Sequence, residues 1–97
     1  MTVEYTNKAV ADLHSIAAYY EGLGIAGLGD RIAARFNEII ARIDARPQTG
    51  RQVPARPGTR AASVLRYPYL IYYEIPEPGI VRILHIRHTS QLPWPGE

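Results

Sequence analysis

The residues best suited to chemistry lie in the last third of the chain, where an apolar run ends in His85, Arg87 and His88. The run before it is rich in tyrosines, namely Tyr67, Tyr69, Tyr72 and Tyr73. Histidine can accept or donate a proton near neutral pH, and arginine stabilises the negative charge that develops on a phosphate. This combination predicts either acid–base cleavage of a phosphodiester or a cationic, aromatic surface that binds a partner.

Two further arginines, Arg60 and Arg66, precede these runs and extend the set of possible anion ligands. A ribonuclease needs a proton donor or acceptor, for which His88 is the candidate, and cations near the phosphate, for which Arg60 and Arg87 are the candidates. We expect His85 to be a half-buried residue of a sheet. A binding protein would instead present its cations and rings to a partner, and the candidate contact residues are then Arg60, Arg66, Tyr72, Arg87, His88 and Trp94.

Several other classes of site are excluded or unsupported by the sequence. The chain has no cysteine, which excludes disulfides and thiolate metal sites. His85 and His88 stand three residues apart with no carboxylate spaced to complete a metal site, so we expect no bound metal and no cofactor. The GxGxxG letters between Gly22 and Gly27 follow a helical segment rather than a strand, so they do not indicate a nucleotide-binding loop.

The net charge of +2 is unevenly distributed along the 97 residues. Residues 1–44 hold four basic and six acidic side chains, whereas residues 45–97 hold seven arginines and three acids. A basic C-terminal half favours an anionic partner. The sequence has neither the basic and apolar start of a signal peptide nor an apolar run long enough to span a membrane, so we expect a soluble, cytoplasmic protein.

Two helices are predicted in the first half of the chain. Val3–Tyr5 is typical of a short strand, and Thr6 or Asn7 is a suitable N-cap for a helix that extends to about Tyr20. A second helix is predicted after Gly27, and Arg46-Pro47 ends it because the residue before proline avoids the α region. Its apolar residues form one stripe, made of Ile32, Phe36, Ile39, Ile40 and Ile43.

The second half of the chain is predicted to form strands. A turn-rich connection over residues 47–59 leads to strands at 60–67, 69–75 and 80–87, and residues 89–97 form a tail. The last two strands form a hairpin closed by Pro76-Glu77-Pro78-Gly79. The order β-α-α-β-β-β predicts one α+β domain over residues 1–97, with a helical hairpin packed on a twisted antiparallel sheet.

Motifs along nearly the whole chain resemble the RelE/ParE superfamily of toxins from bacterial type II toxin–antitoxin systems. They are the Ala9-x-x-Asp12-Leu13-x-x-Ile16 helix, the Pro47-x-x-Gly50-Arg51 turn, Pro57-Gly58-Thr59-Arg60, and the runs 67–73 and 83–88. RelE-like members are endonucleases that cut messenger RNA in the ribosome, whereas ParE-like members share the fold and inhibit DNA gyrase. The nucleases usually carry an arginine where this chain has Leu70, and a lysine-rich loop where this chain has none. The sequence therefore resembles ParE more closely.

The resemblance implies a ParE-like toxin that inhibits DNA gyrase and growth, with no enzymatic activity of its own. It also implies a cognate, ParD-like antitoxin whose acidic C-terminal segment wraps the toxin, and operator DNA is contacted through the antitoxin alone. The alternative is a RelE-like, ribosome-dependent mRNA endonuclease. In that case Arg60, Arg87 and His88 would be the catalytic residues, and the ribosome and its mRNA would be the partners.

Overall fold

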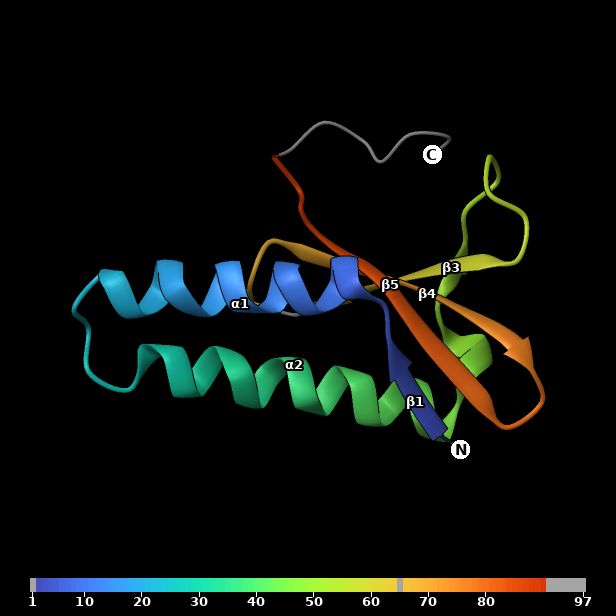
Figure 1. Ribbon diagram of the computed structural model, residues 1–97, viewed down its shortest axis with the longest axis horizontal. Coiled ribbons are helices and arrows are strands. Elements are labelled where there is room, and N and C mark those ends of the chain that lie inside the picture. The colour runs from blue at the N-terminus through green and yellow to red at the C-terminus, as the bar shows by residue number, and fades with distance from the viewer. Residues whose placement is uncertain (1, 65, 91–97) are drawn as a thin grey trace.

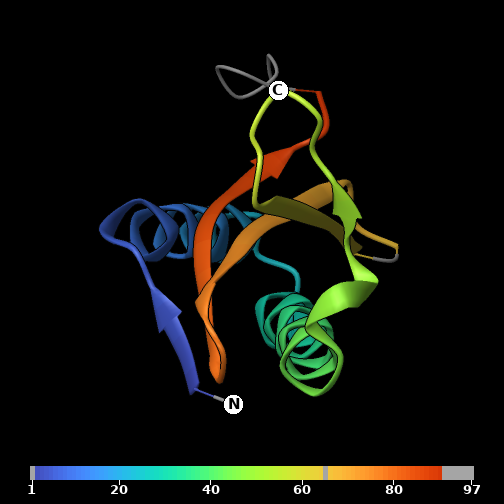
Figure 2. The ribbon, with the colours of Figure 1, turned by 90° about the vertical axis from the view of Figure 1, so that its right-hand side faces the viewer.

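The computed structural model of the protein describes residues 2–64 and 66–90 (Figure 1). Its elements are β1 (Thr2–Tyr5), α1 (Asn7–Gly22), α2 (Leu28–Ala45), the 3-10 turn η1 (Pro47–Thr49), β2 (Arg51–Gln52), β3 (Thr59–Val64), β4 (Tyr69–Glu77) and β5 (Ile80–His88). Two antiparallel helices cover one face of a twisted sheet (Figures 1 and 2). The predicted α+β class and the helix pair ahead of the main strands are confirmed.

The helices begin and end where the sequence predicts. The hydroxyl of Thr6 accepts a hydrogen bond from the backbone N–H of Ala9 at 3.1 Å, which makes Thr6 the N-cap of α1. Helix α2 ends at Ala45, just before Arg46-Pro47. The whole predicted stripe of α2 is buried in the main core: Ile32, Phe36, Ile39, Ile40 and Ile43.

The sheet is mixed rather than wholly antiparallel. Strand order is β1-β5-β4-β3-β2. Strands β3, β4 and β5 pair antiparallel as expected, and β2 pairs antiparallel with β3. Strand β1 departs from the expectation, because it pairs parallel to β5 with Val3 opposite Val81. Four residues at the start of the chain carry no signal of their partner, since pairing direction depends on the route of the chain between β1 and β5.

Strand β2 lies in the segment that the sequence predicts to be a turn-rich connection. It has two residues, with Arg51 opposite Ala61 and Gln52 opposite Arg60. Two residues are too few for an alternating pattern to be recognised. The β4–β5 hairpin is tighter than predicted, because β4 continues through Pro76 to Glu77 and the chain reverses at Pro78 and Gly79, which has φ of 90°.

A bulge in β5 changes which side chains share a face. Tyr72 lies opposite His85 and Tyr73 opposite Ile83, so Leu84 is an extra residue between the two pairs. Strict alternation would separate Ile83 from Ile86, yet both belong to the core beneath the helices. The opposite face of the sheet, here called the far face, carries a smaller cluster of Val53, Ala61 and Tyr72, with Leu70 and Leu84 packed against it.

Tyr73 fastens the connection after α2 to the sheet. Its buried hydroxyl donates to the carbonyl of Pro47 at 2.7 Å and accepts the backbone N–H of Gly50 at 2.9 Å. The contact requires glycine at position 50, because an added Cβ would overlap the Tyr73 hydroxyl oxygen and lie 2.8 Å from Cε1 of that ring. The turn therefore depends on a close approach of backbone to an aromatic ring.

We expect Gly50→Ala to destabilise the protein by about 1–3 kcal/mol, the usual cost of overpacking a rigid site. Urea denaturation of both proteins measures the change. Gly22→Ala is the matched control, because a Cβ there meets nothing within 4 Å and alanine is favoured in a helix. Equal midpoints for Gly50→Ala and the wild type would show that this turn adjusts without strain.

Candidate functional site

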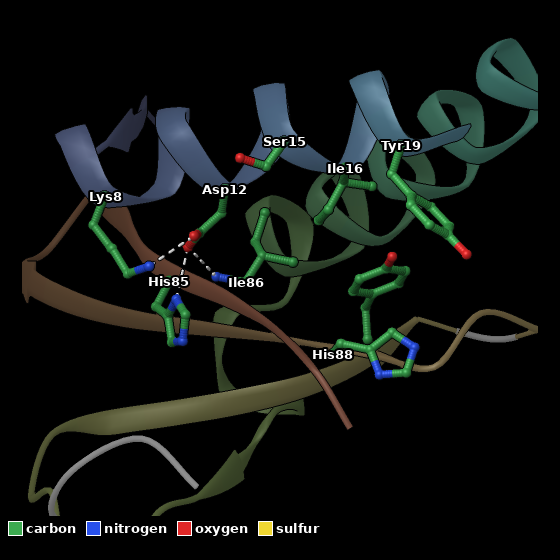
Figure 3. Close-up of a pocket in the computed structure, with 9 residues that line it drawn as sticks. Lys8, Asp12, Ser15, Ile16, Tyr19, His85, Ile86 and His88 are labelled. Carbon is green, nitrogen blue, oxygen red and sulfur yellow. Dashed lines mark hydrogen bonds and ion pairs between the residues drawn. The ribbon is translucent and has the colours of Figure 1, made fainter. Parts of the chain in front are cut away.

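A groove lies between α1 and the C-terminal half of β5 (Figure 3). It has a volume of about 180 Å³, comparable to one large side chain. The residues that line it are Lys8, Asp12, Ser15, Ile16, Tyr19, Tyr69, His85, Ile86 and His88. The groove therefore has two of the three histidines of the sequence in its lining, and one of them, His85, contacts the carboxylate of Asp12.

Asp12 is the most connected side chain in the groove. One oxygen, Oδ2, accepts the backbone N–H of Ile86 at 3.0 Å and lies 2.6 Å from Nδ1 of His85. The other, Oδ1, accepts a hydrogen bond from Nζ of Lys8 at 2.8 Å. All three contacts are drawn in Figure 3. Because the pairing of β1 with β5 ends at Ile83, Asp12 takes over a backbone donor that a strand would otherwise satisfy.

The surroundings of Asp12 favour its charged form. Burial by itself would raise the pKa of this carboxyl, but the hydrogen bonds from Lys8, Ile86 and His85 and the charge of His85 together hold the pKa below its usual value. A carboxylate on Nδ1 fixes the orientation of the imidazole ring. The ring of His85 also stacks on Tyr72, with centroids 5.8 Å apart and planes at 15°. The expectation of a half-buried His85 understates its burial, since only 7% of the residue is exposed.

Arg87 lies on the far face and is held by Tyr72. Its Nε and Nη2 both donate to the Tyr72 hydroxyl, at 3.1 and 3.0 Å. Arg87 is 8% exposed and Tyr72 is fully buried. Tyr72, a candidate contact residue in the sequence, therefore supports a neighbouring cation from inside the fold and presents no surface of its own.

Arg60 is bound to the turn that precedes β2. Its Nη1 donates to the carbonyls of Gly50 and Gln48 at 2.7 and 3.1 Å, and its Nη2 donates to Oε1 of Gln48 at 2.7 Å. These bonds supplement the contact of Tyr73 with the same turn. The guanidinium of Arg60 thus has a structural role in this conformation.

His88, Arg66 and Trp94 complete the set of residues singled out from the sequence. The ring of His88 packs edge-on against Tyr69 at 5.2 Å, and its Nδ1 accepts the backbone N–H of Ser90 at 3.0 Å. Arg66 is exposed in the connection between β3 and β4. Trp94 lies outside the described residues.

The candidates for nuclease catalysis do not converge. Arg60 lies opposite Tyr73 on the helix-covered face of the sheet, whereas Arg87 lies on the far face with Tyr72. His88 pairs with Tyr69, and Arg60 pairs with Tyr73, four residues or about 13 Å further along β4 and on its other side. Within residues 2–64 and 66–90 no three His, Asp or Glu side chains gather as around a metal ion.

The sequence reasoning did not single out the polar residues that α1 contributes to the groove. In the sequence, Asp12 is notable only as part of the Ala9-x-x-Asp12-Leu13 motif, and no pattern marks Lys8, Ser15 or Tyr19 as site residues. One signal was available: Asp12 stands between Ala9 and Leu13 of the apolar stripe, so α1 carries a carboxylate near its buried face. What the carboxylate would meet there depends on the bulge in β5, which the sequence does not reveal.

Comparisons with known protein families and solved structures identify the family of the chain. The family model for the ParE toxin of type II toxin–antitoxin systems, parDE, matches residues 3–93. The chain belongs to the ParE toxin family. A solved structure described as a chromosomal ParDE toxin–antitoxin system from P. aeruginosa has the same fold, with a TM-score of 0.63 at 24% sequence identity, and covers 93% of this chain and 97% of its own. No curated protein matches the sequence.

This ParE-like toxin is thus a member of a toxin–antitoxin system, and membership implies a cognate antitoxin. The resemblance stated from the sequence, closer to ParE than to RelE, is confirmed. Neither helix of the described chain has the length and apolarity that a membrane span requires.

We expect Asp12→Asn to lower the free energy of unfolding at pH 7 by roughly 2 kcal/mol, because a charged acceptor is lost from three donors. The folded-state pKa of Asp12 is lowered, so its contribution is complete above the unfolded value near 3.8 and is lost as the pH falls through the folded value. The stability difference between wild type and variant should therefore shrink as the pH falls below 4. Thermal unfolding over this pH range measures it.

The control is Glu77→Gln, which removes an exposed carboxylate at the end of β4. It should change stability by less than about 0.5 kcal/mol at pH 7. An Asp12→Asn variant as stable as this control would mean that the carboxylate does not fasten α1 to β5.

We expect Tyr72→Phe to destabilise the protein by about 1.5–3 kcal/mol, since it removes the acceptor of two donors from a mostly buried guanidinium. The ring and its stacking with His85 are retained. Tyr19→Phe removes a hydroxyl from an exposed ring and serves as the control. Chemical denaturation compares the two variants, and equal losses would assign Tyr72 no special role toward Arg87.

Proposed function

We propose that this ParE-like toxin arrests growth by binding DNA gyrase and that its cognate antitoxin neutralises it. Membership in the ParE family supports the toxin role and the antitoxin. One observation in the structure favours inhibition by binding over RNA cleavage: the three candidate catalytic residues Arg60, Arg87 and His88 do not form a common site.

Their separation bears directly on the nuclease alternative. Cleavage of RNA next to a ribose hydroxyl needs a proton acceptor, a proton donor and a cation around a single phosphate. The two arginines lie on opposite faces of the sheet, and each guanidinium already donates hydrogen bonds within the protein. Leu70, at the position where the related nucleases usually carry arginine, packs instead against the apolar cluster of the far face.

Charge supports an acidic segment in the antitoxin. Residues 45–97 contain seven arginines and only three acidic residues. An acidic, ParD-like C-terminal segment would therefore complement the charge of this half of the toxin. Such a segment would order on the toxin as it binds. Operator DNA would then be contacted by the antitoxin, and the toxin would act in the cytoplasm, where gyrase is found.

The decisive experiment is a supercoiling assay with purified gyrase and toxin, with and without antitoxin. We expect the toxin to inhibit supercoiling and the antitoxin to relieve the inhibition. In parallel, cells that express the toxin should stop DNA synthesis before protein synthesis. Early arrest of translation with cut mRNA and normal supercoiling would support the ribosomal endonuclease and overturn the proposal.

His88→Ala separates the two mechanisms within the toxin itself. Loss of a general acid or base usually slows a reaction by about 10²–10⁴-fold. If His88 only packs against Tyr69 and accepts the N–H of Ser90, its loss should weaken growth arrest by less than about tenfold. The amount of toxin that halves the growth rate measures the effect. Ser90→Ala is the control, because it keeps the backbone N–H and removes only the hydroxyl that lies 2.6 Å from Nδ1 of His88. Complete loss of toxicity in a folded His88→Ala protein would identify His88 as catalytic.

A further inference from the structure

Arg66 occupies a backbone conformation that disfavours arginine. Residues 66–68 form a turn, and the backbone N–H of Tyr67 donates to the carbonyl of Val64 at 3.3 Å. The φ of Arg66 is +75°, and it is the one described residue other than glycine with a positive φ. Turn positions with a positive φ normally carry glycine or asparagine, because the Cβ of other residues crowds the backbone there.

No interaction within the described chain explains this choice of residue. Arg66 is exposed, and it forms no hydrogen bond or ion pair with any residue that the structure describes. Two other arginines of the basic half differ in this respect, since Arg60 binds the turn before β2 and Arg82 pairs with Glu74 at 3.0 Å. An arginine kept in an unfavourable conformation without an internal partner points to a partner outside the chain.

The turn stands beside a group of aromatic rings that pack against one another. Tyr20 on α1 packs edge-on against Tyr67 and Tyr69, with centroids 6.3 and 6.5 Å apart. Tyr19, whose ring packs edge-on against Tyr20 at 5.1 Å, is 61% exposed. Tyrosine and arginine dominate the energetics of protein interfaces, and rings already held by neighbours lose little entropy on binding. This end of the sheet thus joins a free cation to a preformed aromatic surface.

We propose that Arg66, together with Tyr19 and Tyr67, forms the contact surface for an acidic patch on the target protein of the toxin. The proposal rests on the function proposed above in taking gyrase as that target. The guanidinium of Arg66 would pair with a carboxylate of the target, and the two rings would cover apolar surface beside it. Arginine in place of glycine at the turn then lowers the stability of the fold but contributes to binding of the target.

Two variants separate the stability of the turn from its function. Arg66→Asn removes the charge and relieves the backbone, because asparagine tolerates a positive φ, whereas Arg66→Gln removes the charge and keeps the unfavourable conformation. We expect the melting temperature to rise by about 3–6 °C for Arg66→Asn and to stay within about 2 °C for Arg66→Gln. Both variants should need about tenfold more toxin for half-inhibition of supercoiling and for growth arrest.

The control is Arg46→Gln, which removes an exposed arginine whose φ of −140° is ordinary. It should match the wild type in stability and toxicity. Raised salt should weaken gyrase inhibition by the wild type and by Arg46→Gln more than inhibition by the Arg66 variants, since the pair proposed for Arg66 is exposed. Equal salt dependence in all four proteins would overturn the assignment of a charged contact.

The growth-arrest assay tests the role of Arg66 in toxicity without any assumption about which protein is the target. If the wild type arrests growth but does not inhibit gyrase, the proposed function fails, and loss of growth arrest in both Arg66 variants still supports the contact surface. Growth arrest at wild-type toxin levels in both variants overturns it. So does loss of antitoxin binding with growth arrest intact, because the antitoxin would then be the partner of Arg66.

Discussion

The arrangement of the two layers depends on how the edge of β5 is satisfied where β1 ends. A strand edge leaves backbone donors and acceptors that must find partners. Here the side chains of α1 supply them: Asp12 accepts the N–H of Ile86, and the N-cap hydroxyl of Thr6 donates to the carbonyl of Leu84 at 2.9 Å. The helix is thereby attached to the sheet by directional bonds as well as by apolar packing. The attachment fixes the position of the groove and of His85.

Many of the polar groups that give the C-terminal half its chemical character are engaged inside the protein. Tyr73 and Arg60 bind the turn at Gly50 from the same face of the sheet, and Tyr72 holds Arg87 on the other. Tyrosine suits this role because its ring packs in the core while its hydroxyl reaches a polar partner. A short sheet with a turn-rich connection needs such bonds, since the two-residue β2 supplies little pairing of its own. The residue types of an active site are thus present for structural reasons.

The sequence predicts most of this fold through local signals. The five apolar residues of α2, the cap at Thr6 and the stop at Pro47 each depend on a few neighbouring residues. The parallel pairing of β1, the short β2 and the extra residue at Leu84 depend on contacts between distant segments, and no local pattern indicates them. The same difference applies to the site. Arg87 and His88 could be singled out by type, but the sequence does not reveal the bulge that places His85 opposite Tyr72 on the far face, where it meets Asp12 at the edge of β5.

Hydrogen bonds within the protein also distinguish arginines with a structural role from those that are available to a partner. Arg60 and Arg87 sit on strands in ordinary conformations, and their neighbours accept their hydrogen bonds. Arg66 sits in a turn at a positive φ, where its side chain weakens the fold and gains nothing inside the described structure. Selection for stability alone would favour asparagine or glycine at that position. Among proteins that share this fold, we therefore infer the contact surface from a residue held in an unfavourable backbone conformation. The number of arginines or tyrosines in a segment is a weaker indication.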